Sequence, residues 1–92
     1  MNERVVLYTR KDCHLCDNAR DLVRGVCADE GVAWREVDVD SDPAVRARLS
    51  DLTPVVEVDG VQVGYWRIRP ELVRLALDTG PGVEGDRAVG GQ

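Results

Sequence analysis

The sequence predicts an α/β domain in which a four-stranded mixed sheet carries helices on both faces, in the order β-α-β-α-β-β-α. The chain has 92 residues, enough for one domain. Short apolar runs alternate with runs of helical periodicity. Asp59-Gly60 between two apolar runs predicts a hairpin. Because a helix joins the first two strands, we expect them to be parallel with a right-handed crossover.

The first half of the chain contributes two strands and one helix. Residues 5–8 form a continuous apolar run, typical of a strand covered on both faces. Residues 17–27 place apolar side chains at helical spacing, and Gly31 marks the exit from this helix. Residues 33–39 alternate between apolar and charged side chains, with Trp34 expected in packing. This alternation predicts a half-exposed strand at the edge of the sheet.

The second half adds a helix, the hairpin and a last helix. Asp42 as N-cap and Pro43 in the first turn predict the start of the second helix. Residues 55–58 and 61–65 are the hairpin strands, and Pro70 begins the final helix. The side chains of these two helices that we expect to face inward are Val45, Leu49, Leu52, Leu72, Leu75 and Ala76.

The composition of the chain indicates the limits of the domain and the classes of partner it can have. Residues 1–78 are expected to form one domain, and the Gly-rich residues 79–92 a flexible tail. The net charge is −5 and the basic residues are not clustered, which argues against nucleic acid as a partner. No apolar run approaches the roughly 20 residues of a membrane span, and residues 1–4 carry no signal-peptide core. We therefore expect a cytoplasmic monomer that does not enter membranes.

Cys13 and Cys16 are the most informative residues of the chain. Helical residues three apart lie about 5–6 Å from one another, and a disulfide requires a Cα separation of roughly 4.4–6.8 Å. At the first turn of a helix, unpaired N–H groups and the helix dipole stabilise a thiolate, the form that attacks disulfides. In the cytosol, a C-x-x-C beside a βαβ pattern favours a reversible redox pair over a structural disulfide.

Other roles for the cysteines remain as alternatives. The two thiolates could hold a soft metal, or share an iron–sulfur cluster between two subunits. A zinc site within one chain would need a second close pair of ligands, and His14 is the only histidine, so we expect no metal ligands. Cys27 lies roughly 16 Å along the helix from Cys16, too far for a disulfide, and is expected to be a small buried hydrophobe.

Residues 8–16 resemble the strand-to-active-site segment of glutaredoxin-like proteins of the thioredoxin fold. Residues 53–56 resemble the second active-site loop of that family, and Asp59-Gly60 its hairpin. The resemblance covers roughly residues 4–78. It implies a thioredoxin-like fold and a thiol–disulfide oxidoreductase that exchanges two electrons with protein or glutathione disulfides, with a reductase or thiol donor as its second partner.

The resemblance also implies roles for individual residues. Cys13 would attack the substrate disulfide and Cys16 would resolve the mixed disulfide. Arg10 matches the basic residue with which glutaredoxins contact glutathione. The Thr53-Pro54 bond would be cis, and Thr53 would offer its backbone to an extended substrate segment.

Charges around the cysteines oppose one another. Arg10 and Lys11 favour the thiolate, and Asp12 and Asp17 disfavour it, which leaves the net sign open. His14 would favour the thiolate as an imidazolium and would do little as a neutral side chain, so Lys11 and His14 are candidate modulators.

After the hairpin, the chain departs from glutaredoxins. These proteins carry a Gly-Gly and an acidic cap that bind the γ-glutamyl end of glutathione, whereas residues 64–69 keep one glycine and no acid. We therefore expect no tightly bound cofactor, and glutathione stays open as a co-substrate but not as an obligatory partner. Tyr65 and Trp66 either form an apolar wall for a protein partner or cover the sheet edge and the last helix.

Overall fold

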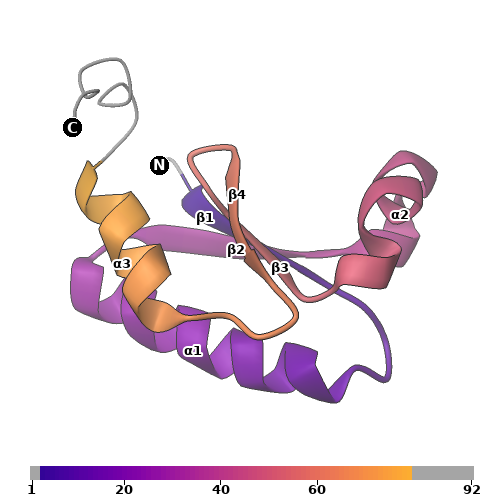
Figure 1. The fold of residues 1–92 in the computed structure, drawn as a ribbon, viewed down its shortest axis with the longest axis horizontal. Helices are drawn as coiled ribbons and strands as arrows, with labels where there is room; N and C mark the ends of the chain where they lie inside the picture. The colour runs from indigo at the N-terminus through magenta and orange to yellow at the C-terminus, as the bar shows by residue number, and fades with distance from the viewer. Residues whose placement is uncertain (1–2, 80–92) are drawn as a thin grey trace.

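The computed structural model describes residues 3–79, which form three layers: a central sheet with helices on each side (Figure 1). Residues 80–92, which contain nearly all of the predicted tail, lie outside the described residues. The elements are β1 (Glu3–Thr9), α1 (His14–Glu30), β2 (Ala33–Asp38), the 3-10 turn η1 (Val39–Ser41), α2 (Pro43–Leu49), the 3-10 turn η2 (Ser50–Leu52), β3 (Val55–Val58), β4 (Val61–Tyr65) and α3 (Pro70–Thr79).

The sheet has the strand order β2-β1-β3-β4. β1 and β2 are parallel, as the crossover through α1 predicts, whereas β1–β3 and β3–β4 are antiparallel. The tight turn between β3 and β4 has positive φ at Asp59 (53°) and Gly60 (84°), the geometry of a type I′ hairpin. The mixed sheet, the edge position of β2 and the hairpin are thus confirmed.

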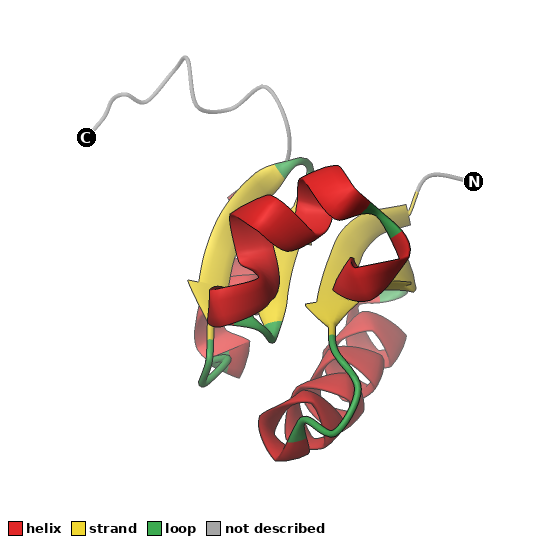
Figure 2. Ribbon diagram, turned by 90° about the vertical axis from the view of Figure 1, so that its right-hand side faces the viewer, coloured by secondary structure: helices red, strands yellow, loops and turns green. Residues whose placement is uncertain are grey.

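Alternating residues of β1 serve two separate cores. Val5 and Leu7 pack on one face of the sheet with the buried side chains of α1 and α3, and Trp34 packs against this core as expected. Tyr8 lies in the second, smaller core, which α2 and η1 cover on the opposite face. In Figure 2 the short helical segments cross one side of the sheet, and α1 lies on the other. The prediction of helices on both faces is confirmed.

Helix α1 extends beyond its apolar-periodic run, residues 17–27, at both ends. It begins at His14, and it continues through polar residues to a C-cap at Gly31, whose φ of 70° is in the left-handed region. Its exit at Gly31 was predicted, but the apolar periodicity stops at Cys27 and hides the last turn. Val39, expected in the second strand, is buried in η1 after β2 has ended.

The predicted inward face of α3 is wrong in part. Leu72 and Leu75 are 38% and 59% exposed, and Val73 and Leu77 are buried in their place. Apolar residues occur on both sides of this helix, so its periodicity is compatible with two orientations. The observed orientation buries Val73 and Leu77 in the core, and in it the Arg74 guanidinium also bonds to Asp29 and Glu30 near the end of α1. For α2 and the residues after it, Leu49 is buried, and Val45 and Leu52 pack against its core as expected.

None of the helices within residues 3–79 is long and apolar enough to cross a membrane.

Candidate redox site

A sulfur atom caps the N-terminus of α1. Cys13 is the N-cap residue, with extended backbone angles, and its Sγ accepts a hydrogen bond from the backbone N–H of Cys16 at 3.1 Å. The same N–H also approaches the Cys13 carbonyl oxygen at 3.2 Å. This position is usually filled by an oxygen-bearing side chain, so Cys13 gave no cap signal in the sequence. With this cap α1 begins at His14, so both cysteines belong to the opening turn of the helix, as their spacing predicts.

Cys13 and Cys16 are joined by a disulfide, with their Cα atoms 5.2 Å apart. This separation lies inside the range expected from their spacing. The two residues differ in accessibility: Cys16 is 1% exposed, whereas Cys13 is only half-buried. An incoming thiol or disulfide therefore reaches Cys13 first, and Cys16 lies three residues further along, inside the first turn of the helix.

The Thr53-Pro54 peptide bond is cis, as the resemblance implied. Tyr8 pairs with Val55 in the sheet, so the segment that follows β1 and the one that precedes β3 lie at the same end of the sheet. The first leads to Cys13, and the second contains Thr53 and the fully buried Pro54. The topology thereby places the two predicted active-site segments at the same end of the sheet.

The predicted charged residues do not all converge on the cysteines. Arg10 donates to the Ser50 carbonyl oxygen at 3.4 Å, and its Nε lies 3.9 Å from Asp40. The Thr53 hydroxyl donates to the same Ser50 carbonyl at 3.3 Å, so Arg10 and Thr53 share an anchor. Lys11 and His14 are exposed and form no ion pair within residues 3–79, and their modulating roles stay predictions.

A partly exposed network that the sequence did not indicate connects β1, β2 and the first turns of α1. Glu36 accepts hydrogen bonds from the Thr9 hydroxyl at 2.7 Å and from two nitrogens of Arg20 at 2.8 Å each. The third contact of Arg20, at 2.9 Å, is with Asp17. Hydrogen bonding by Arg20, followed by that of Thr9, holds the pKa of Glu36 below its ordinary value. The one feature of the sequence that could have drawn attention to Arg20 is its position four residues after Cys16, on the same side of the helix.

Trp66 links the end of β4 to the loop that contains the cis bond. Its backbone N–H donates to the Pro54 carbonyl oxygen at 2.9 Å, and its indole N–H to the Asp51 carbonyl oxygen at 3.0 Å. Its φ of 60° is left-handed, a conformation that a tryptophan rarely adopts. Despite these bonds the residue is 52% exposed, and Tyr65 packs edge-on against it at 5.2 Å between ring centroids.

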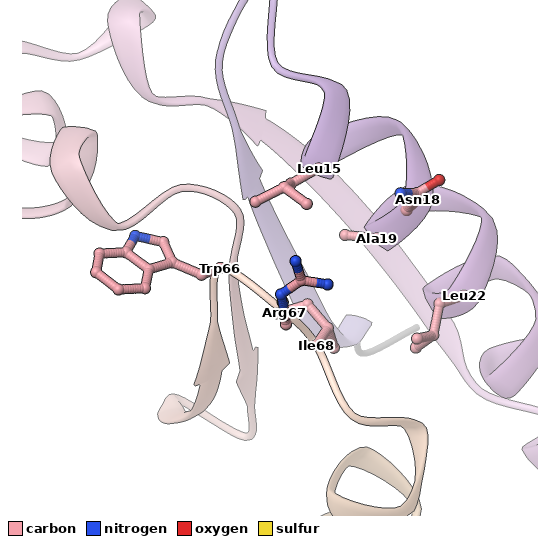
Figure 3. A pocket seen from close by; sticks show the side chains of 7 residues that line it. All are labelled: Leu15, Asn18, Ala19, Leu22, Trp66, Arg67 and Ile68. Atoms are coloured by element: carbon pink, nitrogen blue, oxygen red, sulfur yellow. The ribbon is translucent and has the colours of Figure 1, made fainter.

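A cavity of about 160 Å³ lies between the first turns of α1 and the segment that follows β4 (Figure 3). Its lining residues are Leu15, Asn18, Ala19, Leu22, Trp66, Arg67 and Ile68. Leu15 stands between the two cysteines in sequence and is 37% exposed, so the lining of the cavity begins one residue before Cys16, although neither cysteine lines it. Of the two aromatic residues whose role the sequence left open, Trp66 lines the cavity and Tyr65 does not, and the contributions of Leu15 and Arg67 were not predicted.

Cys27 is outside the site. It is 1% exposed in the core between α1 and the sheet, and burial raises the pKa of its thiol to about 11. The expectation that it acts as a small buried hydrophobe is confirmed.

Within residues 3–79, no group of three or more histidine, cysteine or acidic side chains is placed to hold a metal ion.

Comparisons with known proteins agree with this architecture. A family model described as "Glutaredoxin-like domain (DUF836)" matches residues 4–78. An uncharacterised protein of Mycobacterium tuberculosis is 28% identical over 88 residues, which cover 85% of this chain and 91% of that protein.

Solved structures give the same result. The target protein XcR50 of X. campestris has a TM-score of 0.67 and 29% identity, and the match covers 84% of this chain and 99% of that one. The thioredoxin-like protein BC3987 has a TM-score of 0.57 and 30% identity, covering 78% of this chain and 97% of the other. A wheat glutaredoxin, at 16% identity and a TM-score of 0.54, covers 71% of this chain and 64% of its own, and shows the fold alone.

The fold is therefore that of thioredoxin and glutaredoxin. The chain belongs to the family of glutaredoxin-like domains.

Proposed function

We propose that this protein is a thiol–disulfide oxidoreductase that works through the Cys13/Cys16 pair. The observation that carries the proposal is the disulfide at the N-terminus of α1, with Cys16 buried and Cys13 accessible. A purely structural disulfide gains nothing from this placement. A catalytic one gains from it, because the helix N-terminus stabilises the thiolate that must form at Cys13.

In the reducing direction, the Cys13 thiolate attacks one sulfur of a substrate disulfide and forms a mixed disulfide. The other substrate sulfur leaves as a thiolate and takes a proton from water. Cys16, deprotonated, then attacks the Cys13 sulfur, releases the second substrate thiolate and closes the internal disulfide. The two electrons of the cysteine pair thus pass to the substrate, and a thiol or dithiol donor returns the protein to its reduced form.

Two further residues, Thr53 and Arg10, are candidates for substrate binding at this end of the sheet. Thr53 precedes the cis bond, and we propose that its backbone pairs with an extended substrate segment. Arg10 lies on the same side, anchored to the Ser50 carbonyl that Thr53 also contacts. We assign both residues to substrate binding, with glutathione as an optional co-substrate, and we expect the protein to work as a monomer in the cytoplasm.

Trapping of the reaction intermediate tests the proposal. Cys16→Ser should accumulate a mixed disulfide between Cys13 and a model disulfide, because nothing resolves it. Cys13→Ser should form none. Cys27→Ala is the control and should behave as the wild type, since Cys27 is buried in the core.

Thiol counting and mass spectrometry complete the test. The reduced protein should lose two thiols and two daltons when it is oxidised, and should reduce protein disulfides with a dithiol donor. A folded protein whose cysteine pair never closes, or never passes electrons to any disulfide, would refute the proposal.

A further inference from the structure

The cavity whose lining begins at Leu15, one residue before Cys16, has the size of a site for one side chain. Its volume is about 160 Å³, and its apolar lining residues are Leu15, Ala19, Leu22, Trp66 and Ile68. An apolar protein cavity of about 150 Å³ holds a single benzene-sized group. Sites for whole small molecules usually measure about 300–1,000 Å³. The cavity therefore fits one apolar side chain and is too small for a complete tripeptide such as glutathione.

Arg67 is the one charged residue among the described residues that line this cavity. In Figure 3 the Arg67 guanidinium lies between the side chains of Leu15 and Ile68. Within residues 3–79, Arg67 has neither an ion pair nor a side-chain hydrogen bond, although Arg69 bonds to Glu71 at 2.8 Å. No carboxylate lines the cavity. A ligand that placed a carboxylate here would pair with Arg67 without displacing an existing partner.

The net charge of the whole chain acts against an acidic partner. At −5 it repels anions at a distance, but physiological salt screens such repulsion beyond about 8 Å. Recognition of an acidic group by Arg67 must therefore be a short-range contact. It selects among disulfides already bound at the site and does not steer them toward it.

We propose that this cavity, the Leu15–Ile68 pocket, binds an apolar side chain of a protein disulfide substrate while Arg67 pairs with a neighbouring carboxylate of the same segment. The proposal rests on the oxidoreductase function and narrows its substrate class to protein disulfides. Residues two apart in an extended segment point to the same side, about 7 Å from one another. An apolar residue with an acidic residue two positions away therefore fits the pocket and Arg67 together.

Synthetic peptides test the proposal on the wild-type protein. Each peptide carries one cysteine in a mixed disulfide with a coloured aryl thiol, whose release reports the attack by Cys13. A Leu or Ser is paired with a Glu or Lys two positions later, and the pair is placed at several distances on either side of the cysteine. At the best placement we expect Leu to be preferred over Ser by roughly tenfold and Glu over Lys by about two- to fivefold.

A charge reversal at Arg67 distinguishes a direct contact with this residue from an effect of the net charge of the protein. Arg67→Glu should invert the preference between Glu and Lys peptides. Arg69→Glu is the matched control, because it changes the net charge equally two residues away, outside the pocket lining. This variant should keep the wild-type preference. High salt should weaken the Glu preference and leave the Leu preference unchanged.

The outcomes distinguish this proposal from the general function. Equal rates for all peptides at every placement would overturn the pocket but leave the oxidoreductase function intact. A protein that attacks no peptide and no glutathione disulfide would overturn both. Reduction of glutathione disulfide faster than every peptide, lost in Arg67→Glu, would identify glutathione as the occupant and refute the proposal. If Arg67→Glu does not fold, the wild-type peptide series alone decides.

Discussion

Loss of the negative charge of Glu36 should destabilise the protein near neutral pH and should matter less in acid. Glu36 accepts three hydrogen bonds, from Thr9 and from two nitrogens of Arg20, and these bonds connect β1, β2 and the start of α1. Glu36→Gln removes the charge and one of the two acceptors that match the guanidinium fork. It leaves the shape of the side chain nearly unchanged.

The size of the effect follows from exposure. Charge-assisted bonds are worth about 1.5–3 kcal/mol when shielded, and exposed ion pairs only about 0.2–1 kcal/mol. The side chains of Arg20 and Glu36 are 32% and 31% exposed, between these limits. We therefore expect Glu36→Gln to lower the free energy of unfolding by about 1–2 kcal/mol at pH 7. For a domain of this size the midpoint of thermal unfolding should fall by roughly 5–10 °C.

The pH dependence gives a second, independent readout. The folded protein holds the pKa of Glu36 below the ordinary value of 4.5, mainly through Arg20. The stabilisation is therefore complete above the pKa of the unfolded chain, and it is lost as the pH falls through the lower folded pKa. The difference between wild type and Glu36→Gln should be full at neutral pH and should shrink as the solution is acidified below about pH 4.5.

Urea denaturation followed by circular dichroism, at neutral and acid pH, measures both quantities. Glu30→Gln is the control. Glu30, in the last turn of α1, also pairs with an arginine, but it accepts only one hydrogen bond, of 3.2 Å, from Arg74 of α3. It should cost less than half as much. Equal stability of Glu36→Gln and wild type at pH 7, or a difference that persists unchanged in acid, would refute this reasoning.

Three other predictions concern the scaffold. Arg4→Met should lower the free energy of unfolding by about 1–2 kcal/mol, because Arg4 bonds to both oxygens of Asp59 and to the Leu77 carbonyl, and thermal unfolding measures the loss. Cys27 should resist alkylation in the native protein at neutral pH, since burial raises its pKa to about 11, and mass spectrometry should find modification only after unfolding. Gly31→Ala should cost about 1 kcal/mol in urea titrations, because φ at this position is 70°.

Features carried by short stretches of sequence were predictable. The Cys13–Cys16 spacing, the Asp59-Gly60 turn and the apolar run of β1 each depend on neighbouring residues, and each has the expected place in the fold. The cis bond at Pro54 was predictable only through the family resemblance, since an X-Pro bond is trans in most folded proteins.

Features that depend on contacts between distant segments were not predictable. The pairing of Glu36 with Arg20 requires the parallel register in which Leu7 lies opposite Glu36, and nothing local to either residue specifies that register. Similarly, the buried face of α3 is decided by contacts with α1, because the helix carries apolar residues on two sides. The pocket at Arg67 forms only when α1 and the segment after β4 meet.

The cap of α1 connects the fold to the proposed chemistry. In the disulfide form, the Cys16 N–H donates to a neutral sulfur of Cys13 at 3.1 Å. In the proposed reaction Cys13 acts as a thiolate, and a bond from an N–H to a charged acceptor is about twice as strong as one to a neutral acceptor. The group that starts the helix is thus also the group that stabilises the nucleophile, so no separate basic side chain has to supply this stabilisation. This explains how the site can tolerate Asp12 and Asp17 close to its cysteines, while Arg10 and Arg20 are bonded to other groups.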